Sequence, residues 1–165
     1  MERHNQIAGM VHRNICKEYQ LETPASRWEV PQRVVENNRA KILWDFPIQT
    51  DKHVIANRPD IVIVDKEKKT ATVIDVAVPS DCNIRKKEHE KIDKYQGLRE
   101  EMEKMWKVKV KVVPIVIGAL GAVAPTLEKW LEEIPGETTE VSIQKNAILG
   151  TARMLRRTLK LPGLW

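Results

Sequence analysis

Two apolar runs rich in β-branched residues constrain the fold of this chain more than any other feature. Residues 61–64 read IVIV, residues 71–78 read ATVIDVAV, and the segment between them is mostly charged. Two such runs joined by a short polar segment are typical of an antiparallel β-hairpin. A turn centred between Glu67 and Lys68 places Asp60 directly opposite Asp75.

Two carboxylates that face each other across a β-ladder repel, because their Cβ atoms lie about 4.5–5.5 Å apart. A cation between them removes the repulsion, and magnesium suits the site because it binds one or two carboxylates together with water and phosphate oxygens. Asp75 is also the one charge in a run that is apolar on both faces, and a buried charge is normally paired or metal-bound. The alternatives are that both aspartates face solvent, or that the register differs by one residue.

Residues 85–105 contain no proline and are predicted to form a helix directly after the hairpin. Lys87, Lys91 and Lys94 recur at helical spacing, so they share one side of this helix. Lys91 and Lys94 flank the apolar stripe and are predicted to point at the hairpin; an ordinary solvated helix of interleaved Lys and Glu is the alternative. The stripe consists of Ile92, Tyr95, Leu98, Met102 and Met105.

The Pro-Asp pair at 59–60, the second carboxylate and the E-K-x-x-K-Y segment at 90–95 resemble the PD-(D/E)XK nuclease superfamily. The chain most resembles the restriction-like endonuclease domain at the C-terminus of LINE-type (non-LTR) retrotransposon polyproteins. The likeness extends to R-H-N and V-H-x-x-I-C in residues 3–16, K-I-L-W-D-F at 41–46, V-P-I-V-I-G-A-L-G at 113–121, I-P-G at 134–136 and L-G-T-A-R-x-L-R at 149–156.

This resemblance implies one α/β domain over residues 1–165, with a restriction-endonuclease-like αβββαβ core and a mixed sheet flanked by helices. The periodicity of the sequence gives the same order of elements independently. The expected parts are an N-terminal helix at residues 1–20, a catalytic core at 41–117 and C-terminal helices at 125–161.

The resemblance further implies that Asp60 and Asp75 hold Mg²⁺ or Mn²⁺. The superfamily places a lysine two residues after the second carboxylate, but Ala77 occupies that position here. The catalytic lysine is therefore expected on the following helix, with Lys91 the first candidate and Lys94 the second. Arg58 and Lys87 are expected to contact nucleic-acid phosphates.

The implied activity is target-site nicking of DNA that leaves a 3′-hydroxyl, which primes reverse transcription in the retrotransposon setting. A catalytically inactive nucleic-acid-binding module with the same fold is the alternative. The expected partner is DNA, with the element's RNA as a further candidate; the expected location is the nucleus, and a homodimer remains open.

The composition agrees with an intracellular protein that binds a polyanion. The chain has 165 residues and a net charge of +5, its two cysteines make no disulfide framework, and we expect no membrane span. Residues 141–165 contain no acidic side chain, which predicts a nucleic-acid contact, with another acidic surface as the alternative. The basic residues there are Lys145, Arg153, Arg156, Arg157 and Lys160.

Three further motifs give weaker indications of a functional site. His4, His12 and Cys16 suggest a zinc site, but no C-x-x-C accompanies them, and packing is the favoured role. Asp45, in a strand predicted at residues 41–50, is either a third acid near the metal or a surface residue, and Glu36 is a similar case. The G-A-L-G segment at 118–121 lacks the length and lysine of a phosphate loop and is predicted to be a turn.

Overall fold

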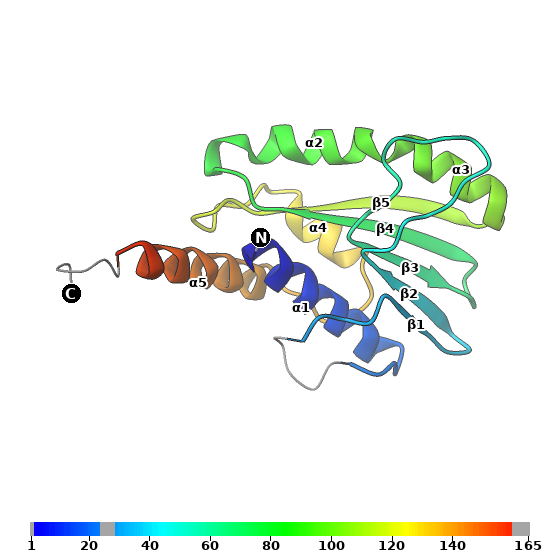
Figure 1. The fold of residues 1–165 in the computed structure, drawn as a ribbon, viewed down its shortest axis with the longest axis horizontal. Helices are drawn as coiled ribbons and strands as arrows, with labels where there is room; N and C mark the ends of the chain where they lie inside the picture. Colours follow the sequence, from blue (N-terminus) through cyan, green and yellow to red (C-terminus); the bar gives the residue numbers. More distant parts are fainter. Residues whose placement is uncertain (1, 24–28, 160–165) are drawn as a thin grey trace.

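The computed structural model describes residues 2–23 and 29–159, with side chains described for all of these except Glu2 and residues 150–159. It shows an α/β fold: an open five-stranded sheet with helices on both faces (Figure 1). The strands follow the chain in the order β1-β2-β3-β4-β5, and only the β4–β5 pairing is parallel. The strands are β1 (Val34–Glu36), β2 (Ala40–Trp44), β3 (Ile61–Asp65), β4 (Thr70–Ala77) and β5 (Lys109–Val116).

Two layers of helices cover the sheet. One face packs against the N-terminal helix and the two C-terminal helices, and the other packs against a helix pair that connects β4 to β5. Such a crossover is needed because parallel neighbours cannot be joined by a tight turn. The helices are α1 (Glu2–Glu18), α2 (Ile84–Lys94), α3 (Gln96–Trp106), α4 (Leu127–Glu132) and α5 (Glu140–Leu159), and a single 3₁₀ turn η1 (Asp81–Asn83) precedes α2.

Strand β4 is buried on both faces, as its sequence predicts. Ala71 and Val73 pack on the α3 side, whereas Ile74 and Val76 pack on the α1 side. Asp75 shares the face of Ala71 and Val73 because side chains alternate along a strand. The strand therefore directs one carboxylate toward the α2–α3 layer.

One side of α1 is buried. Ile7, Val11 and Ile15 are fully buried against the sheet, and Tyr19 is nearly so. The packing fixes the position of α1 under the strands, and it thereby fixes the residues in its first turn.

Two sequence predictions about elements were wrong in detail. The strand expected at residues 41–50 ends at Trp44, because Asp45 adopts a left-handed conformation with φ of 46°. Phe46 and Ile48 therefore pack on the opposite face from Ile42 instead of sharing it. The helix expected at residues 85–105 is divided into α2 and α3 at Tyr95.

Strand β1 was not predicted. It has three residues, it alternates weakly in burial, and it exists through its pairing with β2. Within the described residues, no helix has the length and apolar character needed to cross a membrane.

Candidate functional site

The two aspartates predicted to face each other meet at one end of the sheet. Ile61 pairs with Ile74, which is the predicted register of the hairpin. Asp60 lies just before β3, and its backbone N–H donates to Asp75 Oδ1 at 3.1 Å. Asp60 Oδ2 in turn accepts the Val76 N–H at 2.7 Å. The side chains are 20% and 5% exposed, so both carboxylates are largely withdrawn from water.

The two carboxyl groups titrate as a pair with opposite pKa shifts. Burial, and next the negative charge of Asp60, raise the pKa of Asp75 against the opposing effect of Lys91. Burial also acts to raise the pKa of Asp60, but hydrogen bonds from His4 and the Val76 N–H outweigh it, so the pKa of Asp60 is lowered. The divergence follows from the closeness of two like charges, only one of which is held ionised by strong hydrogen bonds.

Of the two candidate lysines, only Lys91 contacts the aspartate pair. Its Nζ lies 2.6 Å from Asp75 Oδ2, and its side chain is 17% exposed. Lys94 instead places its Nζ 5.2 Å from the centre of the Tyr95 ring. Lys91 thus supplies the ammonium group beside the carboxylates, and Lys94 lies at the rim in a cation–π contact.

Tyr95 is a member of the site that the sequence suggested only as a core residue. It is 2% exposed at the junction of α2 and α3. Burial, followed by the charges of Asp75 and Asp60, raises the pKa of Tyr95, so its hydroxyl keeps its proton and can donate to Asp75. The sequence signal that could have identified Tyr95 is its position at the end of the E-K-x-x-K-Y segment, which contains Lys91 and Lys94.

His4 is the second member that the sequence did not predict in this place. Its Nε2 lies 2.8 Å from Asp60 Oδ2, although 56 residues separate the two in the chain. The hydrogen bond to Asp60 raises the pKa of His4 against the effect of burial. No local pattern predicts this contact, because it depends on how α1 packs under the sheet.

The aspartate pair fits magnesium or manganese on the chemistry of its donors. Within the described residues, no group of three or more His, Cys, Asp or Glu side chains is arranged to hold a metal. Asp60 and Asp75 therefore offer two carboxylates, and magnesium takes one or two from a protein, completing its shell with water and phosphate oxygens.

The three residues of the zinc hypothesis are divided between two places. His12 and Cys16 are buried together, with Sγ 3.7 Å from Nε2, and His12 stacks edge-on against Trp44. His4 lies at Asp60 instead. His12 and Cys16 are therefore packed in the core, which is the role that the sequence favoured.

Arg58 and Asp45 form an ion pair on the surface. Arg58 Nε lies 2.9 Å from Asp45 Oδ1, and a second guanidinium nitrogen contacts Oδ2 at 3.2 Å. Asp45 is thus directed at Arg58, as the surface interpretation of Asp45 expects. On α2, Lys87 is half-exposed and pairs with Glu90 at 3.4 Å. Arg58 and Lys87 both stay predicted phosphate contacts.

The other weak acidic candidate, Glu36, pairs with Lys66 at 2.6 Å on the edge strand. The predicted contacts Arg153, Arg156 and Arg157 belong to α5, but their side chains lie outside the described residues.

The segment at residues 118–121 is a turn, as predicted. The N–H groups of Gly118 and Gly121 bond to backbone carbonyls within the turn. The Leu120 N–H bonds to the Asp81 carboxylate, and a Cβ at residue 118 would overlap that same carboxylate. These amides serve the fold and are not directed at a ligand.

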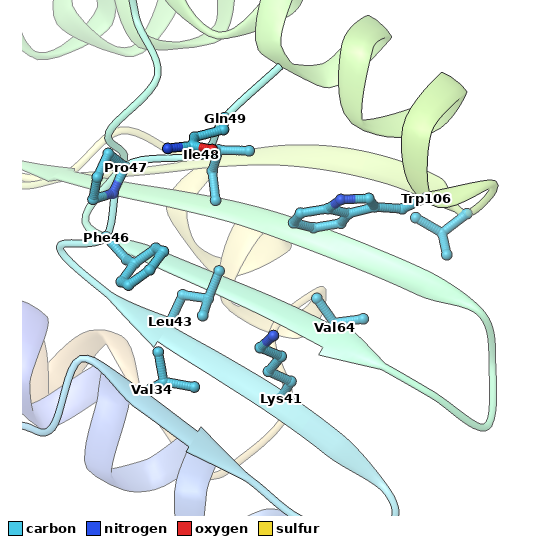
Figure 2. A pocket seen from close by; sticks show the side chains of 10 residues that line it. Val34, Lys41, Leu43, Phe46, Pro47, Ile48, Gln49, Val64 and Trp106 are labelled. Atoms are coloured by element: carbon cyan, nitrogen blue, oxygen red, sulfur yellow. The ribbon is translucent and has the colours of Figure 1, made fainter. Parts of the chain in front are cut away.

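An apolar groove of about 560 Å³ lies on the α3 side of the sheet, where α3 leaves β1 and β2 uncovered (Figure 2). Leu43 and Val64 line it from the strands, Phe46 and Ile48 line it from the loop after β2, and Trp106 lies at one end. None of the predicted site residues belongs to it, so it is separate from the aspartate pair.

Comparison of the chain with protein-family models and with curated protein sequences gives no match. The case for the candidate site is therefore geometric: two adjacent carboxylates, one lysine, one tyrosine and one histidine come from α1, the residue before β3, β4, α2 and the α2–α3 junction.

Proposed function

We propose that this chain is a magnesium-dependent DNA endonuclease domain with a restriction-endonuclease-like core, of the kind found in non-LTR retrotransposon polyproteins. The observation that carries the proposal is the Asp60–Asp75 pair with Lys91 Nζ 2.6 Å from Asp75 Oδ2. The order of elements supports it, because α1, the antiparallel strands β2 to β4, the α2–α3 crossover and the parallel β5 follow the αβββαβ sequence.

Phosphodiester hydrolysis requires an activated water and a positive environment for the phosphate. A magnesium ion held by Asp60 and Asp75 would supply an acidified water and polarise the phosphoryl oxygens. Lys91 holds a positive charge at the pair before substrate arrives, which is the preorganised stabilisation that phosphoryl transfer needs. Tyr95, whose hydroxyl keeps its proton, would be a neutral donor beside Asp75.

The expected products follow from attack of water on phosphorus with cleavage of the bond to the 3′ oxygen. The broken strand then carries a 3′-hydroxyl and a 5′-phosphate. In the proposed setting the domain acts in the nucleus on target DNA, the 3′-hydroxyl primes reverse transcription, and the element's RNA is a second nucleic-acid partner.

The competing proposal is a nucleic-acid-binding module without activity. One observation favours it: the carboxylates already have protein donors, since Asp75 accepts from Lys91 and from the Asp60 N–H, and Asp60 accepts from His4 and the Val76 N–H. A network satisfied in this way is stable as a purely structural feature.

A plasmid-nicking assay in magnesium separates the two proposals. We expect Asp60→Asn and Asp75→Asn to lower the nicking rate by about a hundredfold or more, because each removes a metal-binding charge while preserving shape. Both variants should still bind DNA. The control is Asp93→Asn, an exposed aspartate on the same crossover, which should nick at the wild-type rate. Equal nicking by all four proteins would indicate a contaminating nuclease and favour the binding module.

A further inference from the structure

We propose that His4 is a positioning residue that holds Asp60 Oδ2, so that the other carboxylate oxygen, Oδ1, is presented to the metal ion. The inference rests on the proposed function, since it concerns the same site. It assigns a role in the site to α1, for which the sequence predicted a helix and no contact with Asp60.

The position of His4 is set by the core and not by the site. Ile7, Val11 and Ile15, on the buried side of α1, are fully inaccessible to solvent. The first turn of α1 is therefore held below the start of β3, and the imidazole of His4 reaches the Asp60 carboxylate from the face of the sheet opposite α2.

Two donors converge on one oxygen of Asp60. The Val76 N–H donates to Oδ2 at 2.7 Å, and His4 Nε2 lies 2.8 Å from the same atom. Because a carboxylate only accepts hydrogen bonds, we assign the hydrogen to Nε2. Both lone pairs of Oδ2 are then in use, which leaves Oδ1 as the oxygen of Asp60 that can bind a cation shared with Asp75.

The two donors restrict Asp60 in different ways. The Val76 N–H belongs to β4 and is fixed by the sheet, so alone it would allow the carboxylate to turn about a single hydrogen bond. The bond from His4 removes that freedom. Partners of metal-binding carboxylates commonly change metal affinity by about 10–100-fold when they are removed.

Direct Mn²⁺ binding tests the assignment without any need for cleavage. The full chain is titrated with Mn²⁺ and the free ion is measured by electron paramagnetic resonance, for wild type, His4→Leu, His4→Asn and His4→Gln. Glutamine places an N–H donor close to the position of Nε2, whereas asparagine is polar but too short. The control is His53→Leu, an exposed histidine in the segment between β2 and β3.

We expect His4→Leu and His4→Asn to weaken Mn²⁺ binding by about tenfold or more, and His4→Gln to stay within about threefold of wild type. His53→Leu should bind like wild type. A role of His4 only in tethering α1 would instead lower thermal stability while leaving the Mn²⁺ affinity of the folded protein unchanged, and this result would overturn the inference. His4→Asn decides the question if His4→Leu does not fold.

The same titration separates failure of this inference from failure of the proposed function. If Asp60→Asn weakens Mn²⁺ binding and His4→Leu does not, the inference is wrong and the metal site stands. If neither Asp60→Asn nor Asp75→Asn changes Mn²⁺ binding, the aspartate pair holds no metal, and the inference and the proposed function both fail.

Discussion

Lys91 and Lys94 are three residues apart in the chain, but their ammonium groups have different partners. Both were predicted to point at the hairpin, but Lys94 is exposed and only Lys91 reaches a carboxylate, with Nζ 2.6 Å from Asp75 Oδ2. The chain leaves the α2 axis at Tyr95, and Lys94, just before this break, turns its ammonium group onto the Tyr95 ring. The two lysines are thus nearly equivalent in sequence and distinct in electrostatic role.

We expect Lys91→Ala to lower the nicking rate by about a hundredfold and Lys94→Ala by less than about fivefold. In the proposed mechanism, Lys91 would supply a fixed positive charge at the reacting phosphate, and removing one such preorganised group typically costs about 10²–10³ in rate. Single-turnover nicking at saturating magnesium measures both variants. A larger loss in Lys94→Ala than in Lys91→Ala would show that the catalytic lysine is Lys94 and that α2 rearranges on substrate.

The residues of the site differ in how far sequence could predict them. Asp60 and Asp75 were predictable because strand alternation and a short turn fix their register. Lys91 and Lys94 could be placed on the correct side of a helix but not ranked, since periodicity does not show where a helix breaks. His4 could not be placed at all, because its contact spans 56 residues and depends on packing between a helix and a sheet.

At the scale of elements, α1 packs against α5 and also makes a close backbone approach to the segment between α4 and α5. Gly136, between α4 and α5, has φ of 103°, and a Cβ there would lie 2.6 Å from the Asn14 carbonyl oxygen. A hydrogen bond from Asn14 Nδ2 to Thr138 Oγ1 at 2.9 Å lies beside it. The glycine is therefore required both for its left-handed backbone and for the space it leaves to α1.

We expect Gly136→Ala to lower the free energy of unfolding by about 2–4 kcal/mol, because it combines left-handed strain with a backbone overlap. The control is Gly9→Ala in α1, where a Cβ would meet no atom within 4 Å. That change should raise the free energy of unfolding by about 0.5–1 kcal/mol through helix propensity. Urea denaturation measures both, and equal effects would contradict the proposed contact between Gly136 and α1.

The elements that sequence missed have a common physical cause. Strand β1 is too short to show alternation and is defined by its partner β2. The end of β2 depends on the left-handed Asp45, a residue type that adopts this conformation readily but does not require it. Tertiary pairing and backbone conformation decide these boundaries, whereas the longer periodic segments, α1 and β4, were predicted within a few residues.

For the molecule as a whole, the most buried histidine links stability to pH. His12 is 1% exposed between α1 and β2, where its ring meets Trp44 edge-on at 5.4 Å between centroids. Burial, with a smaller contribution from Arg13, lowers the pKa of His12 from 6.5 to about 4. The folded protein therefore keeps this imidazole neutral at pH values where the unfolded chain would protonate it.

Since the unfolded state binds the proton more readily, the folded state loses stability as pH falls from the unfolded pKa of 6.5 toward the folded pKa of about 4. The loss attributable to His12 is about 3 kcal/mol over this interval. We expect His12→Leu to show a smaller decrease than wild type in urea denaturation between pH 7 and pH 4. The control is His89→Leu, an exposed histidine on α2, which should show the same decrease in the free energy of unfolding as wild type. A wild-type decrease in His12→Leu would show that His12 is not the cause.

The placement of His4 in the first turn of α1 also has a consequence for anything joined ahead of this chain. Helix α1 begins at Glu2, two residues before His4, so a polypeptide joined ahead of this helix would start close to Asp60. Under the proposed function, a partner tethered there would be held near bound DNA at a high effective concentration, set by the tether and not by its own affinity. In the same setting, a bulky purification tag at this end would compete with DNA for access to Asp60 and Asp75.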